Sequence, residues 1–421
     1  MQTTLSTLQI EIRKNLKHNL IVNLLDGGFF GFGIGFASFI TIIPLFVSQM
    51  TDSAILIGLI PAIHSVGWQL PQLLAASWVS RMRRYKPAVL MMTIHERIPF
   101  FGLAAVSWFF LGKNNSLALT LTFILLIWQG LGGGLAANPW QSMMAKIIPA
   151  RHQGSFFGGQ AALANLAASI SAILAGIVLS KLKSPQDFTW LFLLGGISLI
   201  ISLGIIALTR EPEDTQKVNH QKKDPFWLGT RTIWRRDVNF RGFMFSRVLM
   251  QFATMGYAFY IVYCTRYLDM DVFTAGVLTS VLMISQIVAN PVMGWFGDRL
   301  GHHTMLKIGI IASVISGVLA WWATSLIWFY PVMILAGISI VAVWTTSLTM
   351  SVQFGTEAHR PTYIGMANTM LAPATLLAPI FGGWLADAVS YQTTFLASAG
   401  FGIITLIALQ IFVKNPLVIE K

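Results

Sequence analysis

Charged residues are scarce in this sequence: Asp, Glu, Lys and Arg make up 10% of its 421 residues, against roughly 25% in an average soluble domain. So few charges could not cover the surface of a water-soluble globule of this length. The chain has one cysteine, Cys264, which excludes an intramolecular disulfide and a thiolate metal site. Its 29 Phe and 14 Trp exclude a disordered chain, because disordered chains are poor in aromatic residues.

Long apolar runs take the place of the missing charges. The chain is 55% hydrophobic, and its mean hydropathy is +0.67. A helix needs about 20 apolar residues to cross a bilayer, and continuous runs predict helices rather than barrel strands. The first run is too long for a cleaved signal peptide and has no small-residue cleavage site. We predict an all-α integral membrane protein with twelve spans: 20–47, 54–79, 87–111, 117–144, 156–179, 188–208, 242–264, 272–296, 304–326, 328–352, 363–386 and 393–413.

The basic residues predict the orientation of these spans. With a cytoplasmic N-terminus, 22 of the 28 Lys and Arg lie in inside segments and 4 in outside loops. We therefore expect a multi-pass protein of the cell membrane (plasma or inner) with both termini cytoplasmic. The net charge of +12 then reflects orientation, and no nucleic-acid partner is expected.

The longest polar stretch, 209–241, lies near the middle of the chain. It predicts a cytoplasmic juxtamembrane segment over 1–19, a six-helix bundle over 20–208, a central cytoplasmic loop over 209–241, a second bundle over 242–413 and a tail over 414–421. Within the central loop, 225–239 predicts an amphipathic helix on the membrane surface.

Two loops repeat between the halves. The loop after the eighth span contains Gly294, Asp298, Arg299 and Gly301, and it aligns over ten positions with 76–85 after the second span. The segments that open the fifth and eleventh spans, 149–158 and 358–365, are also alike. The chain resembles the major facilitator superfamily (MFS), whose signature loop is G-x-x-x-D-R-x-G followed by two basic residues. The resemblance implies two six-helix bundles in pseudo-twofold repeat around a central cavity, with alternating access.

The signature residues suggest roles in gating. Glycine lets helix backbones approach closely, Asp298 can accept bonds from the neighbouring bundle in one state, and Arg299 anchors the loop at the headgroups. The first copy has Ser80 where the signature has the aspartate. An acidic contact between the second and eleventh helices is therefore in doubt.

Ionisable residues inside the spans are candidates for coupling, since each costs roughly 2.5–3.5 kcal/mol near the membrane centre. Asp26 and Arg247 lie at matching depths of the first and seventh spans, and we predict that they pair across the cytoplasmic mouth. The alternative is that each is satisfied within its own bundle. His64 and Glu96 are further candidates, against the more common role of a hydrogen-bonded packing residue. Because adjacent helical residues point about 100° apart, His95, Glu96 and Arg97 are not expected to form one cluster.

Polar and aromatic side chains on the spans are candidates for lining a solute cavity. Each could instead make an interhelical hydrogen bond, the more common fate in a bundle. With few fixed charges, such a lining suits a neutral, amphipathic or cationic organic solute. The candidates are Gln129, Asn138, Gln141, Gln251, Tyr257, Tyr260, Gln286, Asn290, Trp344 and Thr345.

We therefore expect a secondary active transporter of a small organic solute, coupled to protons and working as an exporter. An uptake permease for a sugar-like or nucleoside-like solute and a non-transporting membrane sensor remain alternatives. The sequence contains no metalloprotease, P-loop or dinucleotide-binding motif. No enzyme activity, cofactor or metal is expected, and the expected partners are the lipid bilayer, the solute and protons, with the chain acting as a monomer.

Overall fold

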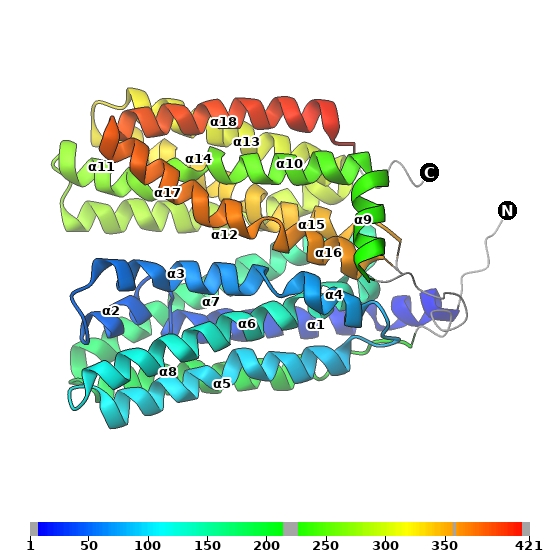
Figure 1. The fold of residues 1–421 in the computed structure, drawn as a ribbon, viewed down its shortest axis with the longest axis horizontal. Coiled ribbons are helices and arrows are strands. Elements are labelled where there is room, and N and C mark those ends of the chain that lie inside the picture. Colours follow the sequence, from blue (N-terminus) through cyan, green and yellow to red (C-terminus); the bar gives the residue numbers. More distant parts are fainter. Residues whose placement is uncertain (1–6, 214–225, 357–358, 415–421) are drawn as a thin grey trace. The chain divides into compact units, whose positions relative to one another are not determined.

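The fold is built from helices, as the apolar runs predict. The computed structural model describes residues 7–213, 226–356 and 359–414, and all regular structure in these ranges is helical (Figure 1). Within them, eleven helical stretches are long and apolar enough to cross a membrane. The remaining predicted span, 54–79, is divided into α3 (Ala54–Gln69) and α4 (Gln72–Val79). The all-α membrane fold is confirmed.

The chain forms two compact units. Unit 1 comprises Met1–Ile148, Leu163–Lys222 and Thr356–Thr369. In it α5 packs against α6 and α8, α1 against α8, and α4 against α16. Besides α3 and α4, its helices are α1 (Thr7–Phe36), α2 (Ile42–Ser48), α5 (Lys86–Phe110), α6 (Asn115–Ile147), the later part of α7 (Ala150–Lys181), α8 (Gln186–Ile206) and α16 (Arg360–Thr369).

Unit 2 comprises Pro149–Ala162, Lys223–Gly355 and Met370–Lys421, so it includes the first turns of α7. In it α13 packs against α14 and α18, and α12 against α14. Its other helices are α9 (Phe226–Arg236), α10 (Val238–Ala253), α11 (Tyr260–Tyr267), α12 (Val272–Leu300), α13 (His302–Trp322), α14 (Phe329–Val341), α15 (Ser347–Val352), α17 (Ala372–Ala388) and α18 (Tyr391–Phe412). Two 3₁₀ turns (Met255–Phe259 and Leu326–Trp328) and a π-helical turn (Ala342–Thr346) join some of them.

Several predicted spans are interrupted. The prediction of one helix over 20–47 is wrong: α1 begins at Thr7 and ends at Phe36, and α2 follows after a break. At the break the Ser38 hydroxyl accepts the N–H groups of Ile40 and Thr41 at 3.2 and 3.3 Å, which competes with helical bonding. The breaks at 70–71 and 370–371 lie beside Pro71 and Pro373, and proline cannot donate a backbone bond.

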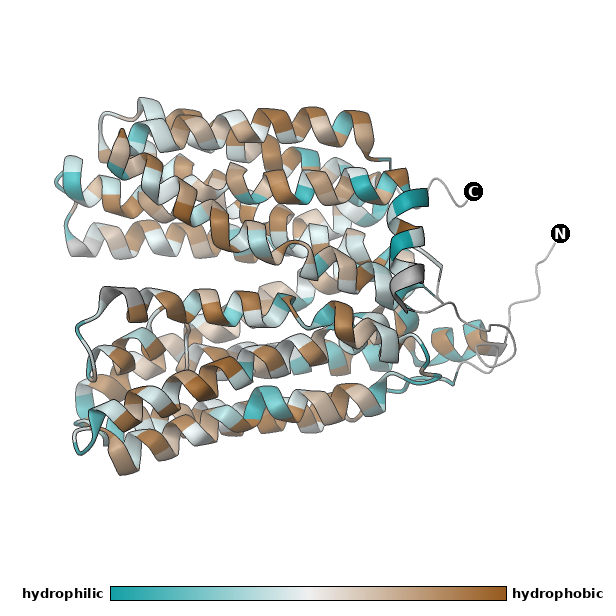
Figure 2. Ribbon diagram, in the orientation of Figure 1, coloured by the Kyte–Doolittle hydropathy of each residue, from teal (hydrophilic) through white to brown (hydrophobic). Residues whose placement is uncertain are grey.

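Apolar residues fill both units and also cover much of their outer surface (Figure 2). Phe46, Phe100 and Phe192 are fully buried in unit 1, and Phe329 and Phe395 in unit 2. Many large apolar side chains are exposed, as expected of helices in a bilayer. Hydrophilic residues gather on α9, where the sequence predicts a helix in the central loop, and that helix is confirmed.

Candidate functional site

A cluster of charges is buried in unit 1, where α1, α5 and α8 meet. Asp26 on α1 is 5% exposed, and its Oδ1 accepts a 2.6 Å hydrogen bond from Ser202 on α8. The Ser202 hydroxyl in turn accepts a 3.0 Å bond from Arg97 Nη2 on α5. One hydroxyl therefore links the carboxylate to the guanidinium.

Glu96 belongs to the same cluster. Its carboxylate lies 3.7 Å from Arg97 Nη1 and accepts a 3.3 Å bond from the Thr93 hydroxyl. Glu96 and Arg97 lie together although they are adjacent, because their long side chains bend toward one another; the three residues from His95 to Arg97 do not form one cluster. His95 instead accepts a bond from Trp128 Nε1 at 3.3 Å.

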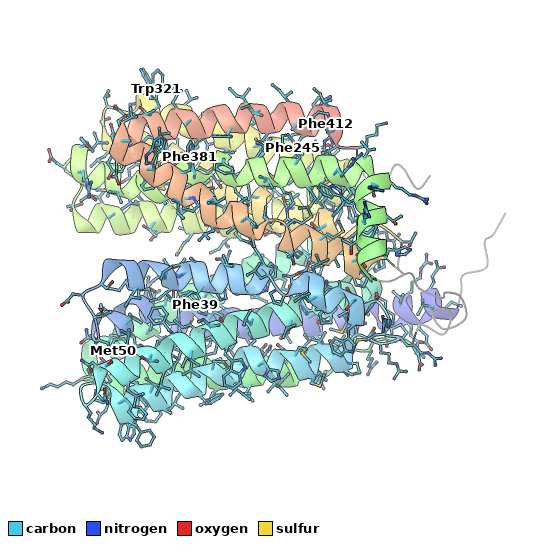
Figure 3. All side chains as sticks on the ribbon, in the orientation of Figure 1. Phe39, Met50, Phe245, Trp321, Phe381 and Phe412 are labelled. Atoms are coloured by element: carbon cyan, nitrogen blue, oxygen red, sulfur yellow. The ribbon has the colours of Figure 1, made fainter. Side chains whose placement is uncertain are left out.

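His64 and Gln129, predicted separately, lie together in unit 1. His64 Nδ1 on α3 is 3.0 Å from Gln129 Oε1 on α6, and the imidazole stacks on the ring of Phe39 with centroids 3.9 Å apart. Phe39, labelled in Figure 3, comes from the segment between α1 and α2. Close contact of Gly67 and Gly130 brings α3 and α6 near enough for this pair.

Asn138 and Gln141 lie in a cluster of buried amides. Asn138 Nδ2 donates to the carbonyl oxygens of Gln72 and Pro361 at 3.1 and 2.8 Å. The Gln72 side-chain oxygen accepts from Asn368 Nδ2 at 2.7 Å and from Gln141 Nε2 at 3.5 Å. These bonds join α4 and α6 to α16. In this structure Asn138 and Gln141 therefore make interhelical hydrogen bonds, which is the alternative to lining a solute cavity.

Thr369, which the sequence analysis missed, hydrogen-bonds to the backbone at the break between α3 and α4. The Thr369 hydroxyl accepts from Leu73 N–H at 3.0 Å and lies 3.0 Å from the carbonyl oxygens of Gln69 and Leu70. A broken helix in a bilayer needs such partners, because no water is there to replace them. In the sequence, Pro71 marks the position of the break. Only the fold shows that Thr369 is the residue that bonds there.

In unit 2, the candidates Asn290 and Thr345 are in contact. The Thr345 hydroxyl donates to Asn290 Oδ1 at 2.7 Å, and Asn290 Nδ2 donates to the Gln286 carbonyl at 2.9 Å. Thr345 and Trp344 lie in the π-helical turn 342–346, and Trp344 is 41% exposed. Single π turns inside α-helices occur frequently at functional sites. Asn290 is 2% exposed, so this group is a hydrogen-bonded polar pair beside the exposed ring of Trp344.

The other candidates on the seventh span make their contacts within unit 2. The Tyr257 hydroxyl donates to Ser313 at 2.7 Å, and the Tyr260 hydroxyl is 3.0 Å from the Ser316 hydroxyl. Tyr260 is 1% exposed, so its ring belongs to the core. Gln251 is also buried, in the last turn of α10.

Arg247 lies one turn before Gln251 and is 4% exposed. Its Nη1 donates to the Ser351 hydroxyl on α15 at 3.4 Å. Asp26 and Arg247 thus make their described contacts within unit 1 and unit 2 respectively. Their pairing across a cytoplasmic mouth stays a prediction.

The signature loop contacts the second turn of α7 within unit 2. Asp298 accepts bonds from Gly154 N–H and Ser155 N–H at 2.7 Å each and from the Ser155 hydroxyl at 2.6 Å. A Cβ on Gly294 would overlap the Gly154 carbonyl, so glycine is required for this approach.

The remaining signature residues shape the loop itself. Arg299 stacks over the Trp295 ring at 3.6 Å. Gly301 has φ +91° between α12 and α13, a conformation that favours glycine.

A second contact missed by the sequence analysis involves Glu211, just after α8. Its carboxylate accepts from the N–H groups of Tyr85 and Lys86 at 2.9 and 2.7 Å and from Lys146 Nζ at 2.9 Å. Glu211 therefore places a carboxylate beside the loop after the second span, where Ser80 takes the position that Asp298 has in the second half. Nothing in the local sequence around Glu211 pointed to this partner.

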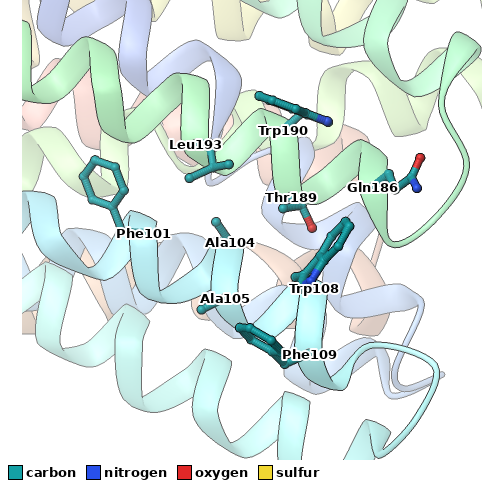
Figure 4. A pocket seen from close by; sticks show the side chains of 9 residues that line it. All are labelled: Phe101, Ala104, Ala105, Trp108, Phe109, Gln186, Thr189, Trp190 and Leu193. Atoms are coloured by element: carbon teal, nitrogen blue, oxygen red, sulfur yellow. The ribbon is translucent and has the colours of Figure 1, made fainter.

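A cavity of about 500 Å³ opens between α5 and α8 (Figure 4). Trp108, Phe109 and Trp190 line it and are 46%, 59% and 52% exposed. No charged residue lines it. Because aromatic side chains on the outer surface of unit 1 line this cavity, we do not consider it a candidate path for a polar solute. Over residues 7–213, 226–356 and 359–414, no group of three or more His, Cys, Asp or Glu is placed to hold a metal ion.

The fold and these sites define a class: a multi-pass helical membrane protein with interrupted helices and buried polar clusters. The family model of the Major Facilitator Superfamily matches residues 28–263 and 243–418. The chain belongs to this superfamily, as the resemblance implies.

The solved structures that the chain resembles are transporters of this superfamily. The E. coli fucose:proton symporter FucP has a TM-score of 0.75 at 14% identity, covering 94% of this chain and 100% of that one. The proton:xylose symporter XylE has a TM-score of 0.74 at 15% identity, covering 97% and 100%. At these identities the likeness shows the fold.

Curated relatives match over shorter stretches. Multidrug resistance protein 2 of Bacillus subtilis is 25% identical over 148 residues, 35% of this chain and 37% of that protein. A probable vesicular acetylcholine transporter of Danio rerio is 28% identical over 132 residues, 31% of this chain and 27% of that protein. The matches thus span about a quarter to somewhat over a third of these relatives.

Proposed function

We propose that this protein is a secondary active transporter that moves a small organic solute by alternating access, couples its movement to protons and works as an exporter. The observation that carries the proposal is the cluster of Asp26, Glu96 and Arg97, buried within spans of unit 1. Each such charge costs roughly 2.5–3.5 kcal/mol near the membrane centre. Charges retained at that cost favour a role in coupling over a purely structural one.

The solute class follows from the polar candidates. Asn290, Thr345 and the half-exposed ring of Trp344 offer amide, hydroxyl and aromatic groups without a fixed charge. They suit a neutral, amphipathic or cationic molecule, since an aromatic face attracts cations and apolar groups. The multidrug resistance and acetylcholine transporter relatives support the same class, and a relative named as a multi-drug resistance efflux pump in Streptococcus pneumoniae supports export.

The proposed topology has both termini in the cytoplasm, because 22 of 28 basic residues then lie inside. The proposed repeat divides the chain into bundles over 20–208 and 242–413. The interrupted helices support the transport proposal, since discontinuous helices are a recurrent feature of substrate sites in secondary transporters.

The test is transport by the purified chain in proteoliposomes under an imposed pH gradient. The solutes are tetracycline, acetylcholine, a hydrophobic cationic dye, fucose and xylose. Accumulation of a drug or cation in vesicles with an acidic interior, abolished by a protonophore, is the expected antiport. Flux that ignores the gradient would contradict proton coupling. Accumulation of a sugar driven by an acidic exterior would instead identify an uptake symporter.

The solute contacts are tested by the variants Asn290→Ala and Thr345→Ala. We expect each to lower the apparent affinity for the transported solute about tenfold, the effect of about 1.4 kcal/mol. Thr279→Ala is the matched control, since this exposed threonine on α12 bonds only to the Ala275 carbonyl one turn earlier among the described contacts. Equal behaviour of all three variants would remove Asn290 and Thr345 from the solute site.

A further inference from the structure

The cluster in unit 1 has more acid than base. Asp26 and Glu96 contribute two carboxyl groups, and Arg97 contributes one guanidinium that interacts electrostatically with both. All three residues are at most 8% exposed. With both carboxyls ionised the cluster would carry a net charge of −1 in a low-dielectric interior, where an unpaired charge is expensive.

We propose that Asp26 and Glu96 together hold one exchangeable proton against Arg97. The proton comes from water, forms an O–H bond on a carboxyl oxygen and returns to water when that bond breaks. With the proton bound the cluster is neutral, and with it released the cluster carries one negative charge. This inference rests on the proton coupling of the proposed function and names the site that provides it.

Arg97 is held in place by neutral groups. Its Nε donates to the Leu199 carbonyl at 2.8 Å and its Nη1 to the Thr93 carbonyl at 3.2 Å. Its Nη2 donates to the Ser202 hydroxyl at 3.0 Å. Since α5 and α8 together fix the guanidinium, it cannot move freely to follow either carboxylate. One cation at a fixed place can balance one of the two acids.

Each acid also has a hydroxyl as its nearest partner. Ser202 donates to Asp26 at 2.6 Å, and Thr93 donates to Glu96 at 3.3 Å. A hydroxyl can donate to a carboxylate or, after rotation, accept from a carboxylic acid. The hydrogen bond therefore survives protonation of either acid, whichever oxygen carries the proton. These hydroxyls make Ser202 and Thr93 positioning residues for the proton.

Among the described residues, α1, α5, α6 and α8 bring no further charge to this level. On α3, whose Trp68 also packs at Gly133, the titratable group is His64, and it is bonded to Gln129. On α8 the only ionisable side chain is Asp187, 15 residues before Ser202, and on α6 it is Lys146 near the helix end. Glu96 faces α6 at Gly133, whose added Cβ would lie 2.8 Å from Glu96 Oε1. On α5, His95 faces Trp128, and the other ionisable residues of α1 lie at least two turns before Asp26. The balance of two acids and one base is therefore local.

The test is infrared spectroscopy of the full chain in lipid vesicles without any solute, titrated upward from about pH 6, where exposed carboxyls with ordinary pKa values near 4 are already ionised. The wild type is expected to show one protonated carboxyl band, equivalent to one group per chain, that disappears as pH rises. Asp26→Asn and Glu96→Gln each leave one acid paired with Arg97, so each is expected to abolish the band completely. Asp187→Asn is the control, since Asp187 is buried on α8 but bonds to the N–H of Phe188.

Absence of the band in the wild type, its survival in either Asp26→Asn or Glu96→Gln, or its loss in Asp187→Asn would overturn the proposal. Size-exclusion profiles and thermal unfolding identify a variant that fails to fold, and the other acid variant then decides. Because this measurement needs no transport, its failure is distinct from failure of the proposed function. A protein that transports against a pH gradient but lacks the band would keep the function and lose this site.

Discussion

The contact between Asp298 and the start of α7 gives a stability prediction that can be worked out from the structure. The Asp298 side chain is 5% exposed and accepts two backbone N–H groups and one hydroxyl, from Gly154 and Ser155. Asp298→Ala removes all three bonds. It also removes the carboxylate from the positive end of the α7 dipole.

The expected cost is about 2–4 kcal/mol. Hydrogen bonds to a charged acceptor contribute about 1.5–3 kcal/mol each. The three contributions are not additive, because Gly154 and Ser155 lie in the second turn of α7, where their N–H groups can bond to carbonyls of the preceding turn once the carboxylate is gone. Since tenfold corresponds to about 1.4 kcal/mol, hydrogen exchange over 150–162 is expected to become roughly 30- to 1,000-fold faster.

The assay is hydrogen exchange by mass spectrometry on peptides that cover the first turns of α7. Asp271→Ala is the matched control, because Asp271 caps the other end of α12 from an exposed position by accepting from Thr274 N–H at 2.8 Å. It is expected to leave exchange over 150–162 unchanged. Equal protection in wild type and Asp298→Ala would refute the reasoning, as would an equal effect of Asp271→Ala.

Two further substitutions, at Gly158 and Glu211, test close helix packing and the buried carboxylate of Glu211. A Cβ on Gly158 would overlap the Asn290 carbonyl, whereas one on Gly176 of the same helix meets nothing within 4 Å. Gly158→Ala should therefore destabilise the protein by about 1–3 kcal/mol and Gly176→Ala should not, as read by the unfolding midpoint; equal midpoints would contradict the packing. Glu211→Gln should cost about 1.5–3 kcal/mol, because a buried acceptor of two N–H groups and Lys146 loses its charge. The control is Glu213, whose side chain is 39% exposed beside Arg83 and Arg84. Glu213→Gln should cost less than about 1 kcal/mol in the same assay. A cost as large as that of Glu211→Gln would count against the burial argument.

Sequence patterns predicted the helices better than their interruptions. An apolar run shows where a chain can cross a bilayer, but the run over 20–47 gave no sign that the Ser38 hydroxyl would bond locally and end α1. The break at 70–71 had a visible cause in Pro71. The residue that completes its backbone, Thr369, lies almost 300 positions later and has no local signal.

The candidate residues divide in the same way. Polar type and depth singled out Asn290 and Thr345, and the structure brings them to 2.7 Å. The same criteria selected Tyr260, whose ring is in the core, because periodicity on a helix does not say which neighbour the face meets. The helical angle between neighbours predicted that His95, Glu96 and Arg97 do not form one cluster, but it did not show that the long side chains of Glu96 and Arg97 meet.

The sequence by itself determined that the chain folds in a lipid bilayer, how many apolar runs it has and to which family it belongs. Low charge, run length and the loop around Asp298 are all local properties of the chain. Only the tertiary structure decided which polar groups meet. It joined Asp26, Ser202, Arg97 and Glu96 from three helices, and it assigned the first turns of α7 to unit 2. The physical reason is that a buried polar group must find a partner, and in a helical membrane protein that partner usually lies on another helix, far along the chain.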